Sequence, residues 1–235
     1  MSRITTLIFD MFNTLAEDTE AHWLASFRRI VQAQDLKIEA ADLRREWSTG
    51  DQEFRERRAS GHATFESYYD AWRNCFEQTF SLLRLKGDAA AAVDIVLEDL
   101  GRRPIHPDTV QALPILQENC RIAVLSNADD RFLDPVVQRL GVNFAAVLSS
   151  EAARCYKPRP ELFQAMLRRL EVAPGDAVYV GDRQFEDVQG AGQAGLRSVW
   201  LNRDSVTLDP NLPTPDYHVA SMLEIPALID CAARN

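Results

Sequence analysis

The chain has 235 residues, of which 46% are hydrophobic and 26% charged, and its formal net charge at pH 7 is −9. This composition is typical of a globular protein that buries a core, and the length fits one domain with an insertion. The negative charge argues against nucleic acid as a partner, since phosphate backbones select basic faces, and no apolar run approaches the roughly 18 residues that span a bilayer.

The first apolar run, residues 4–9, predicts a buried strand that ends at Asp10, and the segment before it is too short for a signal peptide. Similar runs, each followed by a polar or turn residue, predict strands at 122–126, 145–148, 177–181, 198–201 and 217–219. Helical patterns lie at 107–116, 134–140, 160–170 and 186–194. Apolar strands that alternate with helices indicate an α/β fold, a doubly wound parallel sheet covered on both faces.

Between the first two strands the sequence changes character and contains no strand-like run. Amphipathic stretches at 22–34, 40–60, 64–83 and 89–100 predict an all-helical block inserted directly after the first strand. We therefore expect an α/β core domain at 1–15 and 101–235 and an α-helical domain at 16–100. The arginine-rich segment 45–62 is interpreted as a solvated helix face; the alternative is that Arg55, Arg57 or Arg58 faces a binding site.

The four cysteines are Cys75, Cys120, Cys155 and Cys231, and they show no CxxC spacing. This pattern argues against a metal knuckle or a disulfide framework and favours reduced thiols. We expect a cytoplasmic protein, monomeric or homodimeric, that acts on a small molecule.

Polar side chains follow several of the predicted strands, and open α/β sheets bind ligands at the carboxyl ends of their strands. The candidate site residues are Asp10, Thr14, Ser126, Asn127, Lys157, Asp182 and Asp187. Simpler structural roles exist for some of them: Asp187 could interact with a helix dipole, Asn127 could cap the next segment, and Lys157 could be solvated.

Together, these residues could supply a nucleophile, donors for a small anion and ligands for a metal ion. Asp10 can act as a nucleophile, because carboxylates form acyl phosphates. The hydroxyl groups of Thr14 and Ser126 and the charge of Lys157 suit a phosphoryl group or another small anion. Asp182 and Asp187 beside Asp10 would repel one another, and Mg²⁺, which prefers oxygen ligands, would resolve that repulsion.

Four motifs in order, IFDMFNTL, VLSNAD, YKPRPELF and VGDRQFEDVQGAGQAGL, resemble those of the haloacid dehalogenase (HAD) superfamily with a helical cap inserted after the first motif. The resemblance implies a Rossmann-like core and a cap domain that closes over the site. It also implies a hydrolase with Asp10 as nucleophile and Thr14, Ser126, Asn127 and Lys157 as binding groups. Mg²⁺ would be held by Asp10, Asp182, Asp187 and the backbone carbonyl of Phe12.

Phe12 departs from the family pattern. Phosphatases of the family carry an aspartate there that protonates the leaving group, and such assistance is typically worth roughly 10²–10⁴-fold in rate. The retained Asp182 and Asp187 favour a Mg²⁺-dependent phosphohydrolase acting on a small phosphorylated metabolite. Two alternatives stay open: a 2-haloacid dehalogenase-like hydrolase, whose halide leaves without protonation, and a catalytically impaired binding protein. Asn13, where glycine is common, tolerates left-handed backbone.

Overall fold

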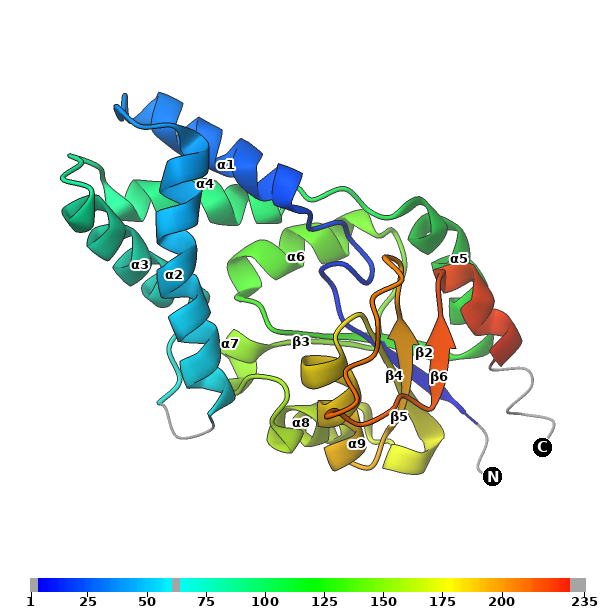
Figure 1. Ribbon diagram of the computed structural model, residues 1–235. Coiled ribbons are helices and arrows are strands. Elements are labelled where there is room, and N and C mark those ends of the chain that lie inside the picture. Colours follow the sequence, from blue (N-terminus) through cyan, green and yellow to red (C-terminus); the bar gives the residue numbers. More distant parts are fainter. Residues whose placement is uncertain (1–3, 61–63, 229–235) are drawn as a thin grey trace. The chain divides into compact units, whose positions relative to one another are not determined.

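A parallel sheet of six strands, in the order β3-β2-β1-β4-β5-β6, organises the part of the chain that carries the candidate residues (Figure 1). The structure is a computed structural model, and it describes residues 4–60 and 64–228. The strands are β1 (Thr6–Phe9), β2 (Arg121–Ser126), β3 (Ala146–Ser149), β4 (Ala177–Gly181), β5 (Arg197–Leu201) and β6 (Tyr217–Val219). This strand order is that of a doubly wound α/β fold, which confirms the predicted fold class.

Contacts divide the described residues into two units. The α/β unit contains residues 4–17, 104–127 and 137–228, and the helical unit contains 18–60, 64–103 and 128–136. The helices of the α/β unit are α5 (Pro107–Asn119), α7 (Ser150–Ala153), α8 (Pro160–Leu170) and α9 (Gly190–Gln193), with short 3-10 turns at Pro174–Asp176 and Met222–Glu224.

The middle of the sheet is fully buried, because helices cover both of its faces. All four residues of β1 are buried, and Phe9 pairs with Val124 of β2 and Val180 of β4. α8 and α9 lie on one side of the sheet and α5 on the other (Figure 1). The core on the α8 side includes Phe163, Tyr179 and Leu125. This packing fixes the carboxyl ends of the strands, where the candidate residues lie.

Most element boundaries agree with the sequence patterns, and one segment differs in kind. β4, β6 and α8 have the predicted bounds. The helix predicted at 186–194 is wrong in form, since Gln184–Gln189 is a π-helix and only Gly190–Gln193 is α-helical. The short helix α7 was not predicted. Wide π turns occur frequently at functional sites because they re-aim side chains.

The helical unit packs four helices around aromatic side chains. They are α1 (Glu20–Ala33), α2 (Ala40–Ala59), α3 (Tyr68–Leu82) and α4 (Ala89–Leu100). The rings of Trp23, Phe27, Trp47 and Phe76 have centroid separations of 5.4–5.6 Å along successive contacts. Such contacts between helices provide the burial that an isolated helix lacks.

The interpretation of segment 45–62 as a solvated helix face is wrong for four of its residues, which are buried: Trp47, Asp51, Phe54 and Arg58. Arg58 is only 7% exposed, donates a hydrogen bond to the hydroxyl of Tyr68 and lies over the rings of Phe54 and Tyr68. The aromatic faces attract the guanidinium, so its burial is compensated. Arg57 remains on the surface and pairs with Glu66 at 3.6 Å.

Residues 128–136 belong to the helical unit because of a helix cap. The carboxylate of Asp129 accepts hydrogen bonds from the backbone N–H groups of Tyr68 (3.0 Å) and Tyr69 (2.8 Å), at the start of α3. A carboxylate at this end satisfies unpaired N–H groups and interacts favourably with the helix dipole. The segment includes most of α6 (Asp130–Arg139).

Cys75, Cys120 and Cys155 are free thiols, whereas Cys231 lies outside the described residues. Within 4–60 and 64–228, no helix combines the length and apolar character needed to cross a membrane.

Candidate active site

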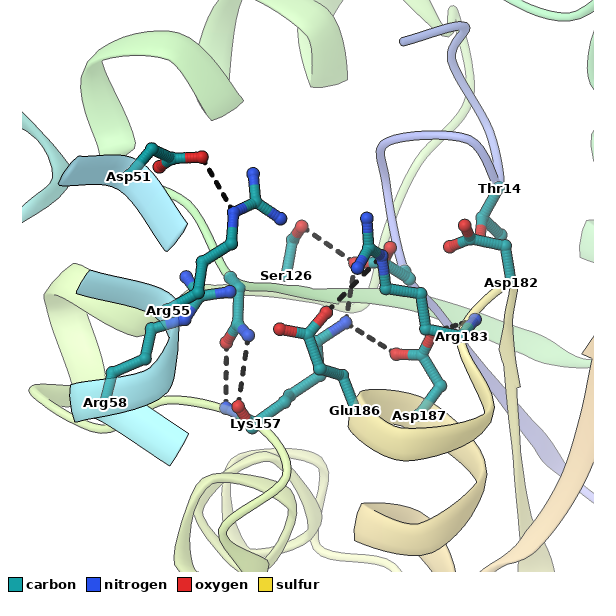
Figure 2. Close-up of polar contacts among 12 residues, drawn as sticks. Thr14, Asp51, Arg55, Arg58, Ser126, Lys157, Asp182, Arg183, Glu186 and Asp187 are labelled. Carbon is teal, nitrogen blue, oxygen red and sulfur yellow. Dashed lines mark hydrogen bonds and ion pairs between the residues drawn. The ribbon is translucent and has the colours of Figure 1, made fainter. Parts of the chain in front are cut away.

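The ends of β1 and β4 bring two aspartates together at the edge of the sheet. Figure 2 shows one of them, Asp182, with Thr14, Lys157 and Asp187. Asp10 directly follows β1 and Asp182 directly follows β4, and the two strands are neighbours in the sheet. The N–H of Asp10 donates to the carbonyl of Val180 at 2.9 Å, which continues the ladder up to Asp10. Between β1 and β4 the strand order reverses, and doubly wound sheets bind their ligands at such a point.

A tight turn follows Asp10 and positions Thr14. The carbonyl of Met11 accepts from the N–H groups of Leu15 (2.8 Å) and Ala16 (2.9 Å), and the N–H of Asn13 donates to Ala16. Asn13 has a φ of 62°, the left-handed conformation that its sequence position predicted. Thr14 is fully buried as a result. Phe12 and Ala16 are paired as a parallel β-bridge. Its two hydrogen bonds run from the N–H of Asn13 to the carbonyl of Ala16 and from the N–H of Ala16 to the carbonyl of Met11.

Two hydrogen bonds fix one oxygen of Asp10. Its Oδ1 accepts from the hydroxyl of Ser126 at 2.8 Å and from Nζ of Lys157 at 2.7 Å. Ser126 ends β2 and Lys157 lies in the loop between α7 and α8, so two strand ends and one loop contribute to this contact. Hydrogen bonds of this kind stabilise the ionised form of a carboxylate and restrict its rotation.

Lys157 is buried, with 2% of its surface exposed, and is not solvated. Its Nζ donates to Oδ1 of Asp10, to Oδ1 of Asp187 at 2.7 Å and to the hydroxyl of Tyr179 at 2.9 Å. Burial opposes the charge, but the two carboxylates outweigh it and hold the pKa of Lys157 well above its usual range. Lys157 therefore stays an ammonium and acts as the internal counter-ion of this cluster.

Asn127 supports Lys157 through the backbone. The side-chain amide donates to the carbonyl of Lys157 at 3.2 Å and accepts from the N–H of Lys157 at 2.8 Å. This paired contact anchors the loop before α8, and the amide does not cap the next segment.

Asp187 approaches the sheet because β4 ends in glycine. A Cβ at Gly181 would lie 2.3 Å from Cγ of Asp187, so no other residue fits there without displacing the carboxylate. Asp187 lies in the π-helix, and its Oδ2 accepts from the N–H of Arg183 at 2.8 Å. The π turn therefore aims this carboxylate back toward Lys157.

The side chain and backbone of Asp182 are both held. Its Oδ1 accepts from the hydroxyl of Thr14 at 3.4 Å, and its carbonyl accepts from Nε1 of Trp200 at 2.7 Å. Trp200 belongs to β5, the next strand in the sheet. The tip of β4 is thus fixed from both sides.

The carboxylates of Asp10, Asp182 and Asp187 offer oxygen atoms within 4.8 Å of one another. Burial, followed by the charges of Asp187 and Asp10, raises the pKa of Asp182 well above its usual range, although Arg183 and Lys157 oppose this. Burial also raises the pKa of Asp187 to about 6, although the positive charge of Lys157 acts to lower it. A crowded, buried set of carboxylate oxygens fits Mg²⁺, which takes hard oxygen ligands and would relieve the repulsion.

Sequence patterns missed three residues that support the site. They are Tyr179, whose hydroxyl contacts Lys157, Trp200, and Arg203, which donates to the carbonyl of Thr14 at 2.9 Å. Tyr179 and Trp200 lie within predicted apolar strands, so they were interpreted as core residues only. A polar atom inside a fully buried strand was the available signal, because such atoms need a partner.

The structure is thus a parallel α/β sheet with aspartates at the tips of β1 and β4 and a buried lysine that bonds Asp10 and Asp187. The family described as haloacid dehalogenase-like hydrolase matches residues 4–195. The chain belongs to this family, which confirms the resemblance seen in the motifs, and it is a hydrolase with phosphatase and dehalogenase relatives.

Human N-acylneuraminate-9-phosphatase is 35% identical over 130 residues, which cover 53% of this chain and 52% of the phosphatase. The chain thus spans about half the length of this relative and of its rat and mouse counterparts. Haloacetate dehalogenase H-2 of Moraxella is 26% identical over 234 residues, 97% of this chain and 99% of the dehalogenase. The HAD-hydrolase YfnB from Bacillus subtilis, solved bound to magnesium, superposes with a TM-score of 0.81 at 19% identity over 97% and 100% of the chains.

Proposed function

We propose that this hydrolase is a Mg²⁺-dependent phosphohydrolase that acts on a small phosphorylated metabolite through Asp10. The observation that carries the proposal is the convergence of three carboxylates, the buried Asp10 and Asp187 and the half-buried Asp182, whose oxygens lie within 4.8 Å of one another. A protein that used Asp10 alone would have no need of two further acids beside it, one half-buried and one buried, whose pKa values are raised. Buried acids with such shifts cluster at functional sites.

In this proposal Asp10 attacks phosphorus with Oδ2, since Oδ1 already accepts from Ser126 and Lys157. A bond forms between Oδ2 and phosphorus while the bond to the leaving oxygen breaks, and that oxygen takes its proton from solvent. Water then attacks phosphorus, releases phosphate and regenerates Asp10. The hydroxyls of Thr14 and Ser126 now donate to Asp182 and Asp10, and they are proposed to redirect these protons to the phosphoryl oxygens when substrate binds.

Asp10, Asp182, Asp187 and the backbone carbonyl of Phe12 are the groups proposed to hold Mg²⁺. When bound, the ion would shield the negative charge of the substrate from that of Asp10 and polarise a phosphoryl oxygen. The magnesium named in the YfnB structure and the phosphatase relatives support this assignment.

Phe12 limits which phosphates are good substrates. A phenyl ring transfers no proton, so Asp10 chemistry at this site lacks the acid that would assist a poor leaving group. We therefore propose that aryl and acyl phosphates, whose leaving groups depart as stable anions, are hydrolysed faster than simple alkyl phosphates.

Dehalogenation is the second candidate, and two observations favour it. Phe12 stands where the family's phosphatases carry an acid, and a departing halide needs no such acid. The Moraxella haloacetate dehalogenase also aligns along nearly the whole chain. In that reaction Asp10 would attack carbon and displace halide, and water would hydrolyse the resulting ester.

One assay separates the two. The protein is incubated with p-nitrophenyl phosphate and Mg²⁺, with and without EDTA, and separately with 2-chloropropionate in the absence of metal. The proposal expects phosphate release that EDTA stops. Halide release that is indifferent to EDTA would replace it with dehalogenation, and inactivity toward both classes over a wider substrate panel would favour a binding role.

A further inference from the structure

Tyr179 is a buried polar residue in the middle of β4, next to the proposed catalytic cluster. Its side chain lies on the α8 face of the sheet, where the ring meets Phe163 at a centroid separation of 5.0 Å. Its hydroxyl oxygen lies 2.9 Å from the carbonyl oxygen of Leu125 and 2.9 Å from Nζ of Lys157. The residue is fully buried.

The chemistry of these partners fixes the direction of both hydrogen bonds. A carbonyl oxygen only accepts, so the single O–H of Tyr179 is donated to Leu125. The phenol oxygen is then an acceptor toward Lys157, whose ammonium only donates. Burial raises the pKa of Tyr179 well above its usual range, so the phenol keeps this proton at neutral pH.

Lys157 has as many acceptors as it has protons. An ammonium group carries three N–H donors, and the acceptors are Oδ1 of Asp10, Oδ1 of Asp187 and the hydroxyl of Tyr179. Two of them are carboxylates of the proposed mechanism, and the third is uncharged and belongs to the strand core. Because the three N–H groups rotate together about the bond to Cε, the uncharged contact adds a third fixed direction to those of the two carboxylates.

We propose that Tyr179 is a positioning residue, whose phenol oxygen takes the third N–H of Lys157 and thereby keeps the other two on Asp10 and Asp187. Lys157 then serves as a fixed counter-ion of the nucleophile and offers no spare N–H to the substrate. The geometric part stands on the contacts alone, and only its kinetic consequence rests on the proposed phosphohydrolase activity.

Two substitutions separate the hydrogen bond from the packing of the ring. Tyr179→Phe removes one oxygen and keeps the ring against Phe163. Phe163→Leu alters the packing on the same ring and leaves every polar atom in place, so it is the matched control for loss of core stability.

The lysine content of the chain makes a direct measurement possible. The sequence contains three lysines, Lys37, Lys86 and Lys157, and the first two are exposed. In protein labelled with ¹⁵N-lysine, we expect one ammonium signal whose protons exchange slowly with water, that of Lys157. Tyr179→Phe should accelerate this exchange by about tenfold or more, because a hydrogen bond of a charged group is lost. Phe163→Leu should change it by less than about threefold.

Kinetics supply the second measurement. With p-nitrophenyl phosphate and Mg²⁺, Tyr179→Phe should lower kcat by about ten- to hundredfold with less than about a threefold change in KM, since a misplaced counter-ion impairs the chemical step more than binding. Phe163→Leu should keep kcat close to that of the wild type.

The outcomes separate the two proposals. Lys157 protons that exchange as fast as those of Lys37 in the wild type would overturn the positioning role, and this measurement needs no variant to fold. An unchanged lysine signal in Tyr179→Phe, or an equal loss of kcat in Phe163→Leu, would also overturn it. A wild type without phosphatase activity, combined with the expected lysine response, would remove the proposed function and support the positioning role.

Discussion

In the helical unit, buried charges meet partners that satisfy them. The carboxylate of Asp51, which is 6% exposed, accepts from Nε1 of Trp72 at 2.8 Å and from Nε of Arg55 at 2.9 Å. Arg58 is held by aromatic faces and the hydroxyl of Tyr68. These contacts link α2 to α3, so the buried charges of this unit contribute to its packing.

In the α/β unit, buried charge is left unbalanced. Asp10, Asp182 and Asp187 lie together, and Lys157 is the ammonium that hydrogen-bonds two of them. The raised pKa values of Asp182 and Asp187 show that the folded protein disfavours their ionised forms. Folding alone gives no reason to keep such a cluster, because buried carboxylates without enough counter-charge destabilise a protein. The difference between the units supports the proposal that the three aspartates serve chemistry, whereas Asp51 contributes to stability.

The largest expected effect is on activity. Asp10→Asn should lower kcat by more than about 1,000-fold, because an amide oxygen is a poor nucleophile in place of the carboxylate. Phosphate release from p-nitrophenyl phosphate measures this. Asp94→Asn is the control, since Asp94 forms a half-exposed pair with Arg131 in the helical unit and should keep wild-type turnover. Substantial residual hydrolysis by Asp10→Asn would contradict a covalent role for Asp10.

The next effect is on stability and concerns the helical unit. Asp51→Asn keeps the shape of the side chain but turns an N–H₂ group toward a donor and removes the charge that faces Arg55. The free energy of unfolding, measured by denaturant titration, should fall by about 2–3 kcal/mol. Asp42→Asn on the same helix removes an exposed pair with Arg45 and should cost less than about 1 kcal/mol. Equal losses in the two variants would show that Asp51 does not stabilise the unit through its buried contacts.

The sequence predicted the sheet and the nearby aspartates for related reasons. Strands buried on both faces are continuously apolar, so a charged residue such as Asp10 or Asp182 marks where each one ends. Because the strands are parallel, those ends meet at one edge of the sheet. Ser126 was found in the same way, as a polar residue at a strand end, and Lys157 as a residue between a strand and a helix.

Other features depend on contacts that local patterns do not encode. The π turn at Gln184–Gln189 differs from an α-helix in hydrogen-bond register, which hydrophobic periodicity does not specify. Arg58 is buried because its partners lie partly on another helix, whereas an arginine in sequence is ordinarily assigned to the surface. Tyr179 and its partner Lys157 are 22 residues apart in the sequence, and Arg203 and its partner Thr14 are 189 residues apart.

The smallest expected effect has the opposite sign to that of Asp51→Asn and tests the comparison most directly. Without divalent cations, Asp182→Asn should raise the free energy of unfolding at pH 7 by about 1–2 kcal/mol, because it removes one of three crowded charges. The amide oxygen can still accept from Thr14, which now donates to Oδ1 of Asp182 at 3.4 Å. Asp204→Asn, at an exposed position, should change stability by less than about 0.5 kcal/mol.

The pH dependence of the metal-free protein follows from the same cause. The folded-state pKa of Asp187, about 6, lies above its ordinary value of 3.8, so between these values the folded protein binds more protons than the unfolded chain. Stability should therefore fall as pH rises through this window, and the raised pKa of Asp182 adds to the fall. Asp182→Asn should make the fall smaller and weaken the stabilisation that added Mg²⁺ gives the wild type. If the stability difference between Asp182→Asn and metal-free wild type does not grow as pH rises from 4 to 6, or Asp182→Asn loses stability at pH 7, the three carboxylates do not repel one another and the contrast between the two units fails.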